Sequence, residues 1–175
     1  MISKRPEIIL TDQEGALLEV DALAYPEDTN LIVDPYAVLE EKQATMGELI
    51  ARAEASLPRP LGEIISAQAE GLKATWLYRL VLLDFDQQKH CRAETVEETL
   101  RQFIWQAASL KVNTLGLDRF ELLEPCISAY RIMSSLCDQV KKVEAAGSSP
   151  PTTLIFSIHQ DAAMRRYQLA LANLD

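Results

Sequence analysis

The stretch LEVDALAYPEDTNL, residues 18–31, decides the fold, because an apolar run leads directly into an acidic segment broken by proline. The small and apolar side chains of Val20, Ala22, Leu23 and Ala24 suit a strand that is covered on both faces. Residues 25–30, YPEDTN, have turn chemistry and predict the end of that strand. Ligands of open α/β sheets bind beyond the carboxyl ends of the strands, so this turn is the first candidate for a site.

Composition predicts one soluble domain spanning residues 1–175, since the chain is 48% hydrophobic and long enough to bury a core. The formal charge is -9, and the basic residues form no stripe, which argues against a nucleic-acid partner. The first residues lack the apolar region of a signal peptide, and no apolar run is long enough to cross a membrane. We therefore expect a cytoplasmic protein that does not contact the membrane.

Three cysteines, Cys91, Cys126 and Cys137, are odd in number and match the spacing of neither a disulfide framework nor a zinc motif. They predict a reduced chain. His90 and Cys91 are adjacent rather than at ligand spacing, so both are interpreted as loop residues. We expect no bound metal and no cofactor.

Strand-like and helix-like segments alternate along the chain. Buried or alternating patterns predict strands at residues 7–11, 17–24, 62–69, 76–85, 111–117 and 152–159. Helical spacing of apolar residues predicts helices from Asp34-Pro35 to residue 53, from Thr95, from Cys126 to Val140, and over residues 163–174. This order is that of a three-layer α/β/α domain with a central mixed sheet.

The helix that starts near Thr95 carries the clearest local signals. Residues 95–98, TVEE, read as a capping box, and Glu97 and Arg101 are spaced to form an i,i+4 ion pair.

The run VDALAYPEDTNL resembles the VDAIVNAANSSL strand of macrodomains, the family that binds ADP-ribose. The stretch GEIISAQAEGLKATWLYRLVLLDFD resembles the next strands of that family, and CRAETVEETLRQFIWQAASLKVNTLGL resembles the helix and strand that follow. The resemblance covers nearly the whole chain and implies a macrodomain-like fold with a nucleotide-type pocket.

The family's ligand motifs are altered in this chain. Its Asn-Ala-Ala-Asn turn, whose last asparagine contacts the distal ribose, is replaced by Tyr25, Pro26, Glu27 and Asp28. Its two glycine-rich phosphate loops are replaced by residues 32–36, IVDPY, and residues 116–120, GLDRF, where a proline and acidic groups oppose an anion. The family's adenine-contacting aspartate falls at Asp12 or Glu14, and the spacing leaves both open.

Parallel strands would bring the polar residues that follow them to one edge of the sheet. The candidate ligand-binding residues are Glu27, Asp28, Asn30, Asp84, Asp118, Arg119 and His159. Several carboxylates around one crevice would favour a cation or a hydroxyl-rich ligand over a phosphate. The alternative interpretation is that the turn acids hydrogen-bond to their own backbone, and that Asp84 and Asp86 form a solvated strand end.

Three functions fit these observations. The first is a non-catalytic macrodomain-like module that has lost ADP-ribose determinants and binds a nucleotide-like or hydroxyl-rich small ligand, or a protein partner. The second is a hydrolase of ADP-ribosyl or nucleotide-sugar bonds, with Asp28 or Glu27 as the base and Asn30 on a ribose hydroxyl. The third is a structural subunit of a homo-oligomer.

Overall fold

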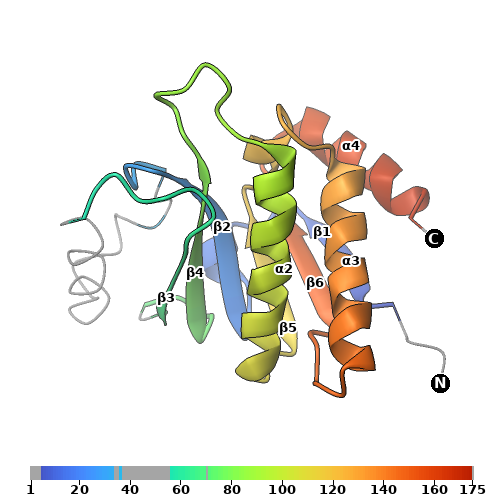
Figure 1. The fold of residues 1–175 in the computed structure, drawn as a ribbon. Helices are drawn as coiled ribbons and strands as arrows, with labels where there is room; N and C mark the ends of the chain where they lie inside the picture. The colour runs from blue at the N-terminus through green and yellow to red at the C-terminus, as the bar shows by residue number, and fades with distance from the viewer. Residues whose placement is uncertain (1–4, 34–35, 37–55, 70, 175) are drawn as a thin grey trace.

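The computed structural model describes residues 5–33, 36, 56–69 and 71–174, and these form a six-stranded sheet with three α-helices (Figure 1). The strand order is β1-β6-β5-β2-β4-β3. The strands are β1 (Glu7–Thr11), β2 (Ala22–Asp28), β3 (Ile64–Gln68), β4 (Trp76–Leu83), β5 (Thr114–Asp118) and β6 (Thr153–Ser157). The helices are α2 (Ala93–Ser109), α3 (Ala129–Ala145) and α4 (Asp161–Ala172), with 3-10 turns η1 (Gly15–Leu17) and η3 (Phe120–Leu123).

Every neighbouring pair of strands is parallel except β3 with β4, which is antiparallel. All six strands that the sequence predicts have counterparts in this one sheet. The predicted α/β class with a central mixed sheet is therefore confirmed.

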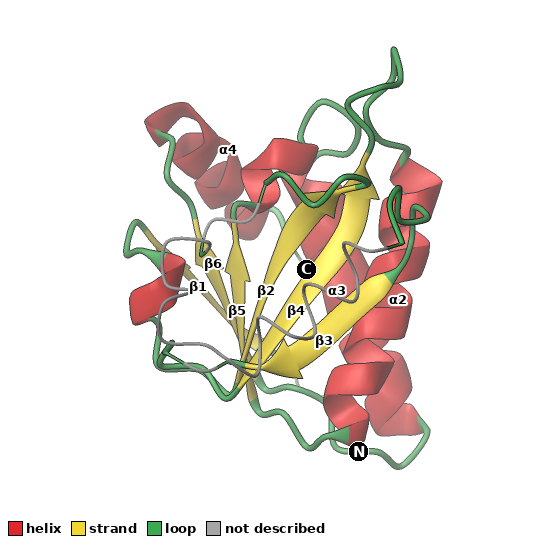
Figure 2. Ribbon diagram, turned by 90° about the vertical axis from the view of Figure 1, so that its left-hand side faces the viewer, coloured by secondary structure: helices red, strands yellow, loops and turns green. Residues whose placement is uncertain are grey.

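The two faces of the sheet are covered differently. Helices α2, α3 and α4 lie on one face of the sheet (Figure 2). Side chains of that face, such as Leu80, Leu82 and Phe156, pack with the helices into the larger core. The opposite face carries Leu23 and Leu77, which belong to a smaller buried cluster together with Leu18, Val20, Tyr25 and Tyr36. The helix predicted from Asp34 to residue 53 lies outside the described residues.

The central strand begins and ends later than the sequence predicted. Residues 15–17 form η1, and β2 runs from Ala22 through the supposed turn to Asp28. Pairing with β4 overrides the turn propensity of this segment, and every residue of β2 is buried. Pro26 is tolerated because it lies beside a register shift at Glu27/Asp28 and beyond Ala24, the last β2 residue that pairs with β5.

The capping box at residues 95–98 and the Glu97–Arg101 ion pair, both predicted from the sequence, were wrong. Helix α2 begins at Ala93, so Thr95 lies inside the first turn, and the capping residue Arg92 makes no side-chain cap. Arg101 pairs with Glu98 rather than with Glu97. Glu97 instead pairs with Arg131 of α3 at 2.8 Å, because the two helices pack side by side.

The cysteine prediction was wrong as well. Cys91 and Cys126 form a disulfide with a Cα–Cα distance of 5.8 Å, and Cys137 is a buried free thiol. Helix α3 starts at Ala129, after Ser128 accepts a hydrogen bond from the N–H of Arg131, so Cys126 precedes the helix. Spacing could not reveal the pair, because packing of α2 against α3 brings the two loops together. No helix in the described part of the chain is long and apolar enough to span a membrane.

Candidate functional site

The parallel strands β1, β6, β5, β2 and β4 all end at one edge of the sheet, and the predicted site residues lie there. The edge carries Glu27 and Asp28 in β2, Asn30 after it, Asp84 after β4, Asp118 in β5, Arg119 after it, and His159 after β6. Two hydrogen-bonded groups result, one at the ends of β5 and β6 and one at the ends of β2 and β4.

The first group is centred on the buried carboxylate of Asp118, which is 1% exposed. His159 Nε2 lies 2.7 Å from Asp118 Oδ1, and the Tyr36 hydroxyl donates to Asp118 Oδ2 at 2.5 Å. Arg119 Nε lies 3.9 Å from Asp118 Oδ2, and Glu14 Oε1 lies 3.9 Å from His159 Nδ1. Burial, and then the neighbouring carboxylate, holds the pKa of Tyr36 far above its usual value, so this hydroxyl stays a donor.

Of the two candidates for the adenine-contacting position, only Glu14 is placed beside this group. Its carboxylate approaches His159, whereas Asp12 is an exposed residue just beyond β1.

The serine, histidine and aspartate at this edge do not form a nucleophilic triad. Ser157 Oγ lies 3.2 Å from His159 Nε2, which is the nitrogen that already meets Asp118. A triad requires the two partners on opposite ring nitrogens. The Ser157 hydroxyl also donates to the carbonyl of Gln13 at 2.6 Å, so the arrangement positions the histidine ring rather than activating a nucleophile.

The space beside Asp118 is closed by backbone. A β-carbon on Gly15 would lie 2.5 Å from the Tyr36 hydroxyl oxygen and 2.7 Å from Asp118 Cγ. Glycine is needed here for close approach, and η1 therefore packs directly on the Tyr36–Asp118 hydrogen bond.

The second group surrounds Glu27, which is fully buried. Its Oε1 accepts hydrogen bonds from the N–H groups of Asp28 at 2.9 Å and Val33 at 2.8 Å. Arg79 of β4 places Nη2 3.4 Å from Glu27 Oε2 and donates from Nε to the Tyr25 hydroxyl at 2.6 Å. A buried ion pair between two adjacent strands thus supports the segment that leaves β2.

Asp28 caps the turn that follows its own strand. Its Oδ2 accepts from the N–H of Asn30 at 3.1 Å, and its Oδ1 accepts from the N–H of Ile32 at 2.5 Å. The Asn30 amide donates to Asp86 Oδ2 at 3.3 Å, and Asp84 Oδ1 accepts from the N–H of Asp86. These contacts match the interpretation in which the acidic side chains accept hydrogen bonds from nearby backbone N–H groups.

Tyr36 connects the two groups and was missed by the sequence analysis. Its ring meets that of Tyr25 at 5.4 Å, edge to face, while its hydroxyl reaches Asp118. Arg79 was also missed, although a lone charge in the run WLYRLVLL is a signal for a buried partner. Tyr36 lies where β2 and β5 stop pairing, after Ala24. The chain segments that follow these two strands leave toward opposite sides of the sheet, and ligands of open α/β sheets bind at such a position.

Burial raises the pKa of Glu27 to about 7, against the lowering influence of the Asp28 N–H and of Arg79. Between pH 4.5 and 7 the Glu27 carboxyl holds more protons in the folded protein than in the unfolded chain, so the stability that this group contributes is complete below pH 4.5 and is lost as the pH rises to 7. We expect the Glu27 contribution to the free energy of unfolding to fall by about 3 kcal/mol across this window. Urea denaturation at several pH values measures it, and Glu27→Gln should flatten the profile. Superimposable profiles for the two proteins would contradict the prediction.

The fold is that of macrodomains, as comparison with solved structures shows. The chain is similar to the Trypanosoma brucei macrodomain in complex with ADP-ribose, with a TM-score of 0.66 and 15% identity over 95% of this chain and 74% of that chain. It is similar to the Oceanobacillus iheyensis macrodomain with ADP, with a TM-score of 0.61 and 10% identity over 94% and 88%. The macro domain of ganglioside induced differentiation associated protein 2 gives a TM-score of 0.65 and 15% identity over 95% and 83%.

At these identities the similarity is one of fold. No protein-family model matches the chain, and no curated protein matches its sequence. The predicted macrodomain-like fold is confirmed by the solved structures.

Proposed function

We propose that this protein, over residues 1–175, is a non-catalytic macrodomain-like binding module whose ADP-ribose determinants are eroded. The observation that carries the proposal is the hydrogen bond from Tyr36 to Asp118. By the resemblance, residues 32–36 and 116–120 occupy the places of the family's two phosphate loops. Here a buried contact of 2.5 Å joins them and puts a carboxylate where the family places backbone amides.

The second phosphate loop is itself absent in its expected form, which supports the proposal. Gly116 to Asp118 belong to β5, and a β-carbon on Gly116 would lie 2.8 Å from Leu23 Cδ1. This glycine therefore serves strand packing. Arg119 follows in a left-handed conformation, with φ of 57°, and leads into η3.

The hydrolase alternative requires a carboxylate that is accessible to water and can take a proton from it. The geometry of Glu27 and Asp28 does not favour this role. Glu27 and Asp28 are both fully buried, and Glu27 Oε1 and both carboxylate oxygens of Asp28 accept hydrogen bonds from backbone N–H groups. A water-activating carboxylate must reach the water from which it takes a proton. A homo-oligomeric structural subunit remains an alternative, and its test is the mass in solution.

The ligand that best fits the edge is a hydroxyl-rich or nucleotide-like small molecule, or a protein partner, rather than a free phosphate. The net charge of -9 and the carboxylates of the candidate site both disfavour free phosphate and nucleic acid. We propose that the module acts without a metal or cofactor.

Titration calorimetry with ADP-ribose tests the proposal. We expect a dissociation constant weaker than about 0.1 mM, equivalent to about -5.5 kcal/mol. Asp118→Asn removes the like charge and should strengthen binding about tenfold. Asp138→Asn, an exposed change of equal charge on α3, is the matched control and should leave affinity unchanged. A low-micromolar constant for the unmodified protein would overturn the proposal.

A further inference from the structure

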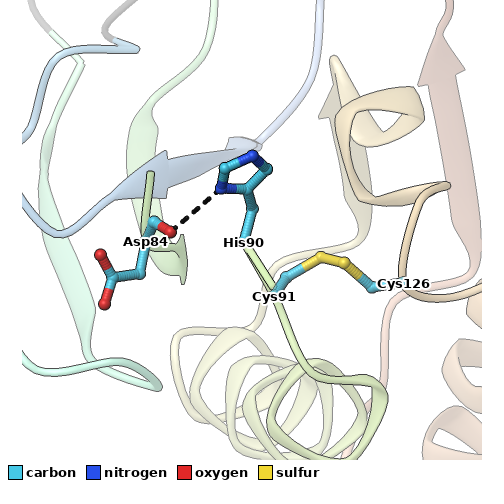
Figure 3. The surroundings of a disulfide bond; sticks show 4 residues. All are labelled: Asp84, His90, Cys91 and Cys126. Atoms are coloured by element: carbon cyan, nitrogen blue, oxygen red, sulfur yellow. Dashed lines mark hydrogen bonds between the residues drawn. A yellow bond between two sulfur atoms is a disulfide. The ribbon is translucent and has the colours of Figure 1, made fainter. Parts of the chain in front are cut away.

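The loop between β4 and α2, residues 84–92, projects beyond the end of β4 before it returns to α2 (Figure 1). The two ends of the loop are held together, at a place we call its neck, by two contacts between Asp84 and His90. The N–H of Asp84 donates to the carbonyl of His90 at 2.7 Å, and His90 Nδ1 lies 3.3 Å from the carbonyl of Asp84 (Figure 3). A carbonyl only accepts, so Nδ1 carries the proton in this contact.

The disulfide fastens this neck to a different part of the molecule. Cys91 is the residue next to His90, and its partner Cys126 lies between η3 and α3 (Figure 3). The bond closes a segment with a sequence separation of 35 and links the starts of α2 and α3. The closed segment is 91–126, so residues 84–90 lie outside it and the bond fixes the loop at its Cys91 end.

The same loop touches the candidate site. Asp86 accepts from the side-chain amide of Asn30, two residues beyond Asp28. Phe85, 48% exposed, packs edge to face on His90 at 5.4 Å. One wall of the site is therefore a polar, exposed loop whose far end is covalently fixed.

We propose that the Cys91–Cys126 disulfide is a thiol-sensitive tether that holds the 84–92 loop against the strand-end site, and that its reduction releases this wall. The proposal rests on the site location given under the proposed function. Its experiment reports on the loop itself, so either idea can fail alone.

The chemistry is ordinary thiol–disulfide exchange with a small dithiol as reductant. Cys91 is buried whereas Cys126 is half-buried, so the attacking thiolate reaches the Cys126 sulfur. A mixed disulfide forms there, the Cys91 thiolate leaves and takes up a proton, and the second thiol of the reductant then displaces Cys126. Two electrons pass from the dithiol, which becomes a cyclic disulfide, to the two cysteines.

Limited trypsin digestion with and without dithiothreitol tests the tether, because Lys89 is an exposed cleavage point inside the loop. We expect reduction to raise the cleavage rate after Lys89 by about tenfold or more, since proteolysis follows the population of the open form. Hydrogen exchange of residues 84–92 and of the Asn30 amide should rise in parallel, while β6 and the middle of α3 stay protected.

A double variant, Cys91→Ser with Cys126→Ser, should show the fast rate with or without reductant. Cys137→Ser alters the buried free thiol and should behave like the unmodified protein. Intact mass confirms the redox state of each sample. Cleavage that reduction leaves unchanged, equal loosening of the loop and of α3 and β6, or an air-oxidised protein without the disulfide would each overturn the proposal.

Discussion

Replacing Arg79 with Met should lower the free energy of unfolding by about 3–5 kcal/mol at pH 8 and by much less at pH 5. At pH 8 Glu27 is mostly ionised, because its pKa is about 7, and the substitution leaves a carboxylate without its guanidinium in a fully buried position. At pH 5 Glu27 is protonated, so the charge that needs compensation is absent. Urea denaturation at the two pH values measures the difference.

Arg165→Met on the exposed side of α4 is the matched control and should change stability by less than about 0.5 kcal/mol. Combining Arg79→Met with Glu27→Gln should cost less than the sum of the single changes, since the two side chains form one pair. An Arg79→Met loss of equal size at both pH values would show that the charge of Glu27 does not set the effect.

Leu82→Ala should cost about 2–5 kcal/mol, because the side chain is fully buried between the sheet and the helices and its loss leaves a cavity. Thermal or urea unfolding measures it. Leu169→Ala on α4, where the side chain is 66% exposed, is the control and should have an effect below about 0.5 kcal/mol. Similar losses at the two positions would contradict the assignment of β4 to the core.

The run that contains Leu82 also shows why so much of the fold was predictable. Apolar continuity in WLYRLVLLDF requires cover on both faces, and every residue of β4 after Trp76 is indeed buried. Element boundaries were less accurate where tertiary contacts outweighed local preference. The segment YPED has turn composition, but its pairing with Arg79–Leu83 holds it extended as far as Asp28.

For the candidate site residues, only their position in the fold was predictable. Strand polarity fixed the edge at which Asp28, Asp84, Asp118 and His159 lie, since that follows from the order of elements. The partners of these side chains come from distant parts of the chain. Tyr36 reaches Asp118 across 82 positions, and a contact of that separation leaves no local pattern in the sequence.

The Tyr36–Asp118 contact also determines how a ligand could reach the edge of the sheet where the parallel strands end. The hydroxyl, the carboxylate and the backbone of Gly15 pack closely, so an incoming group would have to displace protein atoms. Binding at this edge would then compete with Tyr36, an intramolecular partner present at a fixed effective concentration. The apparent affinity would scale with the fraction of molecules in which Tyr36 has moved aside. Selectivity would therefore depend on which molecules can replace the tyrosine side chain at Asp118.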